Sequence, residues 1–159
     1  VYPDIYEKQL AKYDDYPSRK KLPLRRIPKL GCLWNDVIQC APVHPHLIYD
    51  EITKRGLKLP PQVMFYAIPV EKIAHLPVVV YRSKMKTNAL EEIPEDLITP
   101  FDPDTYEALT AVPPDALAWY DSLVEKGRVF GHFVGIPHVL IQGTIDVSDV
   151  ETIVWSESP

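Results

Sequence analysis

Two segments of the chain space their hydrophobic residues as an amphipathic helix does. Residues 44–56 and 113–127 each have a proline near the start and a glycine at the end. Proline is tolerated in the first helical turn and glycine commonly ends a helix, so both segments carry local start and stop signals. The apolar faces consist of Leu47, Ile48 and Ile52 in the first segment and of Leu117, Tyr120, Leu123 and Val124 in the second. We predict a helix over each range.

Other segments show weaker helical patterns. Residues 2–16 repeat apolar positions at close to helical spacing, and 32–41 fits one short helix. Residues 101–112 begin with Asp102, a plausible N-cap, followed by a proline. Residues 70–76 are long enough for about one helical turn. These segments predict short helices in the N-terminal half and the middle of the chain.

Strand-like runs dominate the rest of the sequence. They are rich in β-branched and aromatic residues and are bounded by proline or glycine, which is typical of strands. The runs are 62–68, 77–83, 128–135, 138–147 and 152–157. Because the last three are joined by short connections, antiparallel pairing is expected. The sequence therefore predicts an α+β fold with a mainly antiparallel sheet.

Charge is divided unevenly along the chain. Residues 1–86 carry 15 of the 17 Lys and Arg and 8 of the 22 Asp and Glu, a balance of +7, whereas residues 87–159 have a balance of −12. Proline is also unusually frequent, at 17 of 159 residues, which favours short elements with stiff connections. No apolar run reaches the ~20 residues that a membrane-spanning helix needs. We divide the chain into an N-terminal arm, 1–31, and a single α+β domain, 32–159.

The positive charge is concentrated in residues 17–31, which contain no acidic residue. Its cations are Arg19, Lys20, Lys21, Arg25, Arg26 and Lys29. Prolines at 17, 23 and 28 exclude a continuous helix, so we expect an extended segment with its basic side chains pointing outward. Such a segment fits RNA phosphates, anionic lipid or an acidic protein surface. The alternative is a solvated loop, or an arm folded onto the acidic half of the chain.

Two histidines near the C-terminus suggest a small polar site. His132 and His138 lie on successive predicted strands and would face each other across the pair, with Gln142 nearby. No Asp, Glu or Ser lies within residues 130–143 to complete a catalytic set, so two half-exposed strand residues are the favoured interpretation.

A second candidate is a metal site around residues 31–51, which contain both cysteines. Cys32, Cys40, His44 and His46 are zinc-ligand types, but seven residues between the cysteines are not the close pair that structural zinc uses. We expect two small buried cysteines instead, and a His44 that caps a helix or faces water. The acidic residues of 102–107 lack the glycine of a calcium loop. Six glycines are too few to build a nucleotide loop, and no cofactor is predicted.

These features favour a non-catalytic structural component of a large multi-subunit assembly. A ribonucleoprotein such as an organellar ribosome fits best, with other protein subunits as neighbours and RNA bound through residues 17–31. The alternatives are an accessory subunit of a respiratory-type membrane complex, and a small α+β enzyme or ligand-binding domain with a histidine-containing pocket. Two cysteines without a disulfide framework favour an intracellular, reducing compartment, with the mitochondrial matrix as one candidate.

Overall fold

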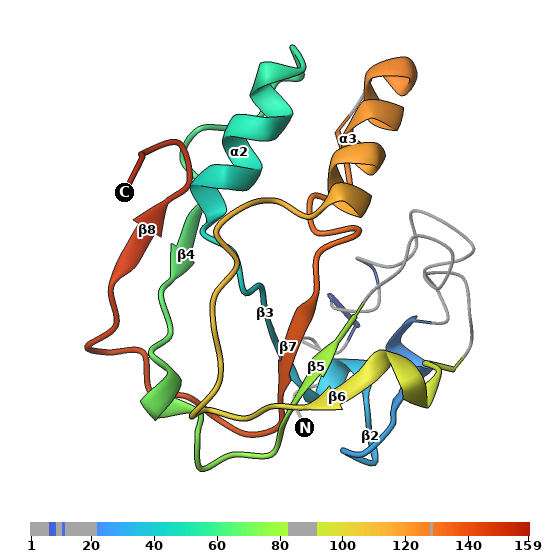
Figure 1. The fold of residues 1–159 in the computed structure, drawn as a ribbon, viewed down its shortest axis with the longest axis vertical. Coiled ribbons are helices and arrows are strands. Elements are labelled where there is room, and N and C mark those ends of the chain that lie inside the picture. The colour runs from blue at the N-terminus through green and yellow to red at the C-terminus, as the bar shows by residue number, and fades with distance from the viewer. Residues whose placement is uncertain (1–6, 9–10, 12–21, 83–91, 128) are drawn as a thin grey trace.

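The computed structural model describes residues 7–8, 11, 22–82, 92–127 and 129–159, and has the α+β fold that the sequence predicts (Figure 1). The α-helices whose bounds fall within the described residues are α2 (Pro45–Lys54) and α3 (Pro114–Lys126). The strands are β1 (Arg26–Ile27), β2 (Cys32–Leu33), β3 (Ile38–Cys40), β4 (Met64–Tyr66), β5 (Val78–Tyr81), β6 (Ile98–Pro100), β7 (His138–Ile141) and β8 (Thr152–Val154). Short 3₁₀ turns are η1 (Leu22–Leu24), η2 (Trp34–Asp36), η3 (Val70–Lys72) and η5 (Glu95–Leu97).

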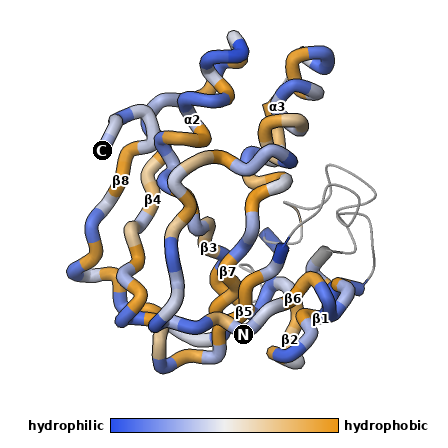
Figure 2. Tube along the Cα trace, in the orientation of Figure 1, coloured by the Kyte–Doolittle hydropathy of each residue, from blue (hydrophilic) through white to orange (hydrophobic). Residues whose placement is uncertain are grey.

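The centre of the molecule is a four-stranded antiparallel sheet in the order β3-β7-β5-β6. The middle strands β7 and β5 are mostly hydrophobic along their length (Figure 2). Because neighbouring residues on a strand point to opposite faces, β7 divides its side chains between two cores. His138 and Leu140 face one core, and Val139 and Ile141 face the other.

The first face of this sheet is covered by the β1–β2 hairpin. Ile27 and Cys32 are cross-strand partners in the hairpin and are buried against Val79 and Leu140 of the sheet. Trp34, in η2, belongs to the same core. Residues 22–31, which the sequence assigns to an arm, therefore pack on the body of the protein.

The second face of the sheet looks toward a separate two-stranded ribbon made of β4 and β8. Ile73, Val139 and Ile141 are buried on this side, with half-buried Ile68 and Ile145 around them. The packing is incomplete here, and the gap forms the pocket described below.

Helices α2 and α3 lie side by side at one end of the molecule and share a third core (Figure 1). Both alternate between hydrophobic and hydrophilic residues, as the spacing predicted (Figure 2). The predicted signals are present: Pro45 and Pro114 begin the helices, and Gly127 ends α3 in the left-handed conformation. Arg55, just after α2, donates from Nε to Asp121 Oδ1 at 2.7 Å and so links the end of α2 to the middle of α3.

Four of the predicted strand segments contain a strand, in each case shorter than expected. The predicted strand segment 128–135 contains no strand in its described part, residues 129–135, so that prediction is wrong. Within its described part, Gly131 and Gly135 both have positive φ, and residues 132–135 form a turn against α3. Added to Gly135, a Cβ would lie 2.5 Å from the Ala116 backbone nitrogen, so the close approach to α3 requires glycine.

Two helix predictions are also wrong. Residues 32–41 form β2, η2 and β3, because β2 pairs with β1 and β3 with β7. Residues 101–112 form no helix: the Asp102 carboxylate accepts from the Asp104 backbone nitrogen at 3.1 Å and from Thr105 Oγ1 at 2.9 Å. This side chain stabilises a turn, where a helix cap was expected.

The single helical turn predicted in 70–76 is present as η3. The helix predicted over 2–16 lies mostly outside the described residues. Within that range the structure describes Glu7, Lys8 and Ala11, which are helical.

Candidate functional site

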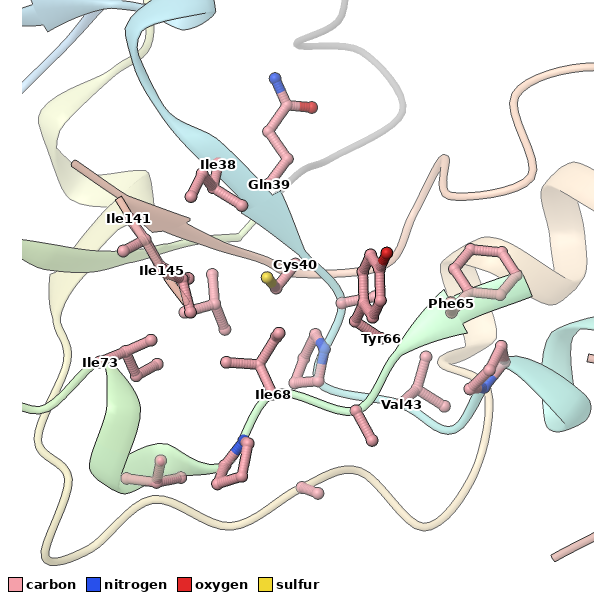
Figure 3. A pocket seen from close by; sticks show the side chains of 18 of the residues that line it. Ile38, Gln39, Cys40, Val43, Phe65, Tyr66, Ile68, Ile73, Ile141 and Ile145 are labelled. Carbon is pink, nitrogen blue, oxygen red and sulfur yellow. The ribbon is translucent and has the colours of Figure 1, made fainter. Parts of the chain in front are cut away.

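A pocket of about 860 Å³ lies between β3, at the edge of the four-stranded sheet, and β4 of the ribbon. β3 contributes Ile38 and Cys40, and β4 contributes Phe65 and Tyr66 (Figure 3). The remaining wall comes from β7, from the chain after β4 and η3, from Phe133, and from residues 41–45, 101–108 and 145–153. The pocket exists because the ribbon and the sheet do not pair edge to edge.

The lining is predominantly aliphatic and aromatic. Figure 3 shows Cys40, Ile68, Ile73 and Ile145 around the same open space. At the mouth, Ile38 is 37% exposed and Tyr66 is 59% exposed. Apolar side chains thus line both the interior and the opening of the pocket.

Most of the polar side chains that line the pocket are uncharged. Burial raises the pKa of the Cys40 thiol. Burial also raises the pKa of the Tyr106 hydroxyl, and Cys40 adds to that shift. Glu151 is the single carboxylate among the lining residues, which include no Lys or Arg. The pocket is therefore built for an apolar group and offers a thiol that is less nucleophilic than an ordinary cysteine.

His138 is among the residues that line the pocket, but its ring packs on the other side of the sheet from most of this lining. Its ring packs 6.0 Å from Trp34 and 6.1 Å from Tyr81, measured between ring centroids. Burial lowers the pKa of His138 to about 4, an effect that the Ile136 backbone only partly offsets. Its buried Nδ1 has no hydrogen-bond partner among the described residues. His138 is thus a neutral ring within a hydrophobic core.

The predicted pairing of His132 with His138 is wrong. His132 lies in the turn after Gly131, where its ring makes an edge contact with Trp155 at 5.6 Å between centroids. Its backbone carbonyl accepts from the Tyr120 hydroxyl at 2.6 Å. Gln142 follows β7, roughly 13 Å along the strand from His138 at ~3.3 Å per residue. The three residues belong to different surroundings and do not form one site.

The four zinc-ligand types around residues 31–51 are also separated. Cys32 is buried in the core beneath the hairpin, whereas Cys40 borders the pocket. His44 caps α2, as predicted, with its Nδ1 accepting from the His46 backbone nitrogen at 3.2 Å. His46 Nδ1 contacts the Trp155 carbonyl at 3.0 Å. The described residues contain no group of three or more His, Cys, Asp or Glu arranged to hold a metal ion.

The basic segment is only partly described. Arg19, Lys20 and Lys21 lie outside the described residues. Arg25, which directly precedes β1, corrects the expectation of outward-pointing cations: it is 2% exposed and is buried like Ile27, two residues further on. Arg26 faces out, beside Leu24, which is 70% exposed. Lys29 is an exposed residue, but its Nζ donates a hydrogen bond to the Ile98 carbonyl at 2.7 Å. Within residues 22–31, Arg26 is therefore the cation best placed to meet another molecule.

An alternative prediction was a histidine-containing pocket, and His138 is among the residues that line this one. Sequence reasoning missed the rest of the pocket. Its lining comes from strands and loops that are distant in sequence, and the aliphatic residues concerned look like ordinary core residues. The one available signal was the run of apolar residues between prolines at 62–70, too short to close a core by itself.

Fold and pocket together define the class: a small α+β protein with an apolar pocket between a four-stranded sheet and a separate two-stranded ribbon. Comparison with known proteins finds no matching family model, no similar curated protein and no similar solved structure. Among the described residues, none of the helices has the length and apolar character needed to cross a membrane.

Proposed function

We propose that this protein is a non-catalytic structural component of a large multi-subunit assembly. The observation that carries the proposal is the outward face of β4, where Met64 is 67% exposed and Tyr66 is 59% exposed. Single exposed hydrophobic residues are ordinary on protein surfaces, but adjacent ones on a sheet face favour a contact surface.

The geometry of the ribbon explains this exposure. Phe65 points inward and packs against Phe133 and Trp155, with ring centroids 6.1 and 5.9 Å away. Met64 and Tyr66, one residue to either side, therefore lie on the opposite face of β4 and are exposed, with Tyr66 at the mouth of the pocket. Neither β4 nor β8 pairs with any other described strand, and β8 lies on the outside of the molecule, so the free edge of β8 can offer backbone groups to a neighbouring chain (Figure 1).

RNA is the second proposed neighbour, which makes the assembly a ribonucleoprotein such as a mitochondrial ribosome. The support is the charge of residues 17–31, which contain six cations and no acid. Arg26 and Leu24 are exposed at the end of this segment, next to the chain that carries Arg19, Lys20 and Lys21. A cation at a phosphate adds salt-dependent affinity, and an apolar side chain beside it can pack on a sugar or base.

Sedimentation of the tagged full chain in extracts of its own cells tests the assembly role. The wild type should sediment with a large particle, and ribonuclease should release it. The double substitution M64D/Y66D should move most of the protein to the free fraction, because two charges cannot be buried in an apolar contact. V124D is the matched control, since Val124 is also an exposed hydrophobic residue, on α3, and should leave sedimentation unchanged. A wild-type chain that sediments as a free monomer contradicts the proposal.

RNA contact is tested separately with the substitutions R19A, K20A, K21A and R26A in one chain. Arg25 is left intact because it is buried and its loss would disturb the fold. Binding of the purified protein to RNA should weaken at least tenfold, and the dependence of affinity on salt should become shallower. Equal affinity and salt dependence in the variant and the wild type would remove RNA from the proposal while leaving the protein contacts of β4 in place.

A further inference from the structure

We propose that the pocket between β3 and β4 is a binding site for an uncharged apolar small molecule, such as an alkyl or isoprenoid chain that ends in a hydroxyl group. This inference does not depend on the assembly role, because the pocket is formed by the described chain alone.

The first argument is the size and surface of the pocket. A volume of about 860 Å³ falls within the ~300–1,000 Å³ typical of small-molecule sites. Water inside an apolar cavity lacks the two to four polar partners that hold it, and even a dry cavity of ~150 Å³ can bind a ring the size of benzene. An apolar ligand would replace poorly bound water with contacts to Ile68, Ile73 and Ile145.

The second argument is charge. An anionic head group needs a cation or a cluster of donors, and no Lys or Arg is among the lining residues. Lys72, the cation of the adjacent η3, is paired with Asp149. Glu151 lies in the pocket wall and would repel a carboxylate or phosphate. The remaining polar side chains of the lining outside the His138 core could meet one polar end of a ligand: the Tyr66 and Tyr106 hydroxyls, the Cys40 thiol, the Gln39 amide and the His44 ring.

The third argument is access. The pocket opens where Ile38 and Tyr66 are partly exposed, so a ligand can enter without displacing the sheet. Apolar residues at the opening also suit the tail of a chain-like molecule. A protein segment of a partner is the competing occupant, and the experiment below distinguishes it, because the purified chain is used without any partner.

The test uses the purified full chain and the uncharged fluorescent probe N-phenyl-1-naphthylamine. Its fluorescence should rise on binding, and dodecanol should displace it. Dodecanoate, with the same chain length and a negative charge at pH 7.5, should require at least tenfold higher concentration. Absence of probe binding, or displacement by dodecanoate at concentrations equal to or below those of dodecanol, overturns the proposal.

Two further measurements assign the binding to this pocket. I68W fills the space beside Cys40 and should weaken probe binding at least tenfold, whereas L24W adds the same ring at an exposed position and should not. Should I68W fail to fold, protection of the wild-type cysteines decides instead. Saturating dodecanol should slow the alkylation of Cys40 by N-ethylmaleimide at least threefold and leave that of Cys32, on the opposite face of the sheet, unchanged. Equal rates for Cys40 with and without dodecanol would place any bound molecule elsewhere and refute the assignment.

Discussion

Tyr81 and His138 are direct cross-strand partners on β5 and β7, and their ring centroids lie 6.1 Å apart in the core beneath the hairpin. Trp34 packs against both rings. A histidine in such a cluster is stable only when uncharged, because the surrounding rings cannot solvate an imidazolium.

This burial predicts acid sensitivity. The pKa of His138 is lowered from 6.5 to about 4 in the folded protein, so the unfolded chain binds a proton that the folded protein excludes. Stability should be fully present above pH ~6.5 and fall as the pH drops toward ~4, by up to about 3 kcal/mol. Urea unfolding at pH 7, 5.5 and 4.5 measures this slope.

H138F should flatten that slope, since phenylalanine fits an aromatic cluster and does not titrate. A shallow dependence should remain, because burial also lowers the pKa of His132. H75Q, at an exposed position, serves as the control and should keep the wild-type slope. An unchanged slope in H138F would show that other groups cause the acid sensitivity.

Gly135 should tolerate no side chain. Its φ of +79° favours glycine, and a Cβ would lie 2.5 Å from the Ala116 backbone nitrogen. We expect G135A to lower the free energy of unfolding by about 3 kcal/mol or more, as strain and a backbone clash combine. Gly56 is the matched control: its φ is +77° with nothing within 4 Å of an added Cβ, so G56A should cost only about 1 kcal/mol. Equal losses measured by urea unfolding would mean that the turn moves away from α3.

The Tyr120 hydroxyl should matter for stability. Tyr120 is fully buried, and its hydroxyl donates to the His132 carbonyl at 2.6 Å, which holds the turn 132–135 against α3. Y120F should cost about 1–2 kcal/mol, because the buried carbonyl loses its donor. Y66F removes a hydroxyl from an exposed tyrosine and should change the unfolding free energy by less than ~0.5 kcal/mol. A loss in Y120F as small as that in Y66F would show that water replaces the bond.

The neighbouring residues Arg25 and Arg26 should have different roles: Arg25 should stabilise the fold, and Arg26 should bind RNA. Arg25 is buried beside the hairpin core, so R25A should lower the unfolding free energy by about 2 kcal/mol or more. Arg26 points outward, so R26A should change it by less than ~0.5 kcal/mol and weaken RNA binding alone. Thermal unfolding and RNA titration of both variants check this, and a destabilised R26A with a stable R25A would reverse the assignment.

Local signals explain which elements were predictable. Helices α2 and α3 have a proline at one end, basic residues and glycine at the other, and an apolar stripe between them, all within about a dozen residues. β4, β5, β7 and β8 lie inside runs of β-branched and aromatic residues. Segment 128–135 has the same composition, but its described residues, 129–135, contain a turn and no strand, because α3 supplies the donors for their carbonyls.

The surroundings of the predicted site residues, in contrast, could not be predicted from local signals. Arg25 and Arg26 are adjacent residues of the same type, so the local sequence does not predict which of them is buried. Only the pairing of β1 with β2 decides that. His132 and His138 were expected to meet because they are close in sequence, yet each packs against a tryptophan from another part of the chain.

By itself, the sequence determined the fold class, the two long helices and the division of charge, because each depends on residues that are near one another along the chain. Only the tertiary structure decided the strand order, the burial of Arg25 and His138, and the apolar pocket. Arg25 and His138 are buried where the hairpin packs on the sheet, and the pocket forms between β3 and β4. No local pattern of residues predicts the energy of such packing between separate elements.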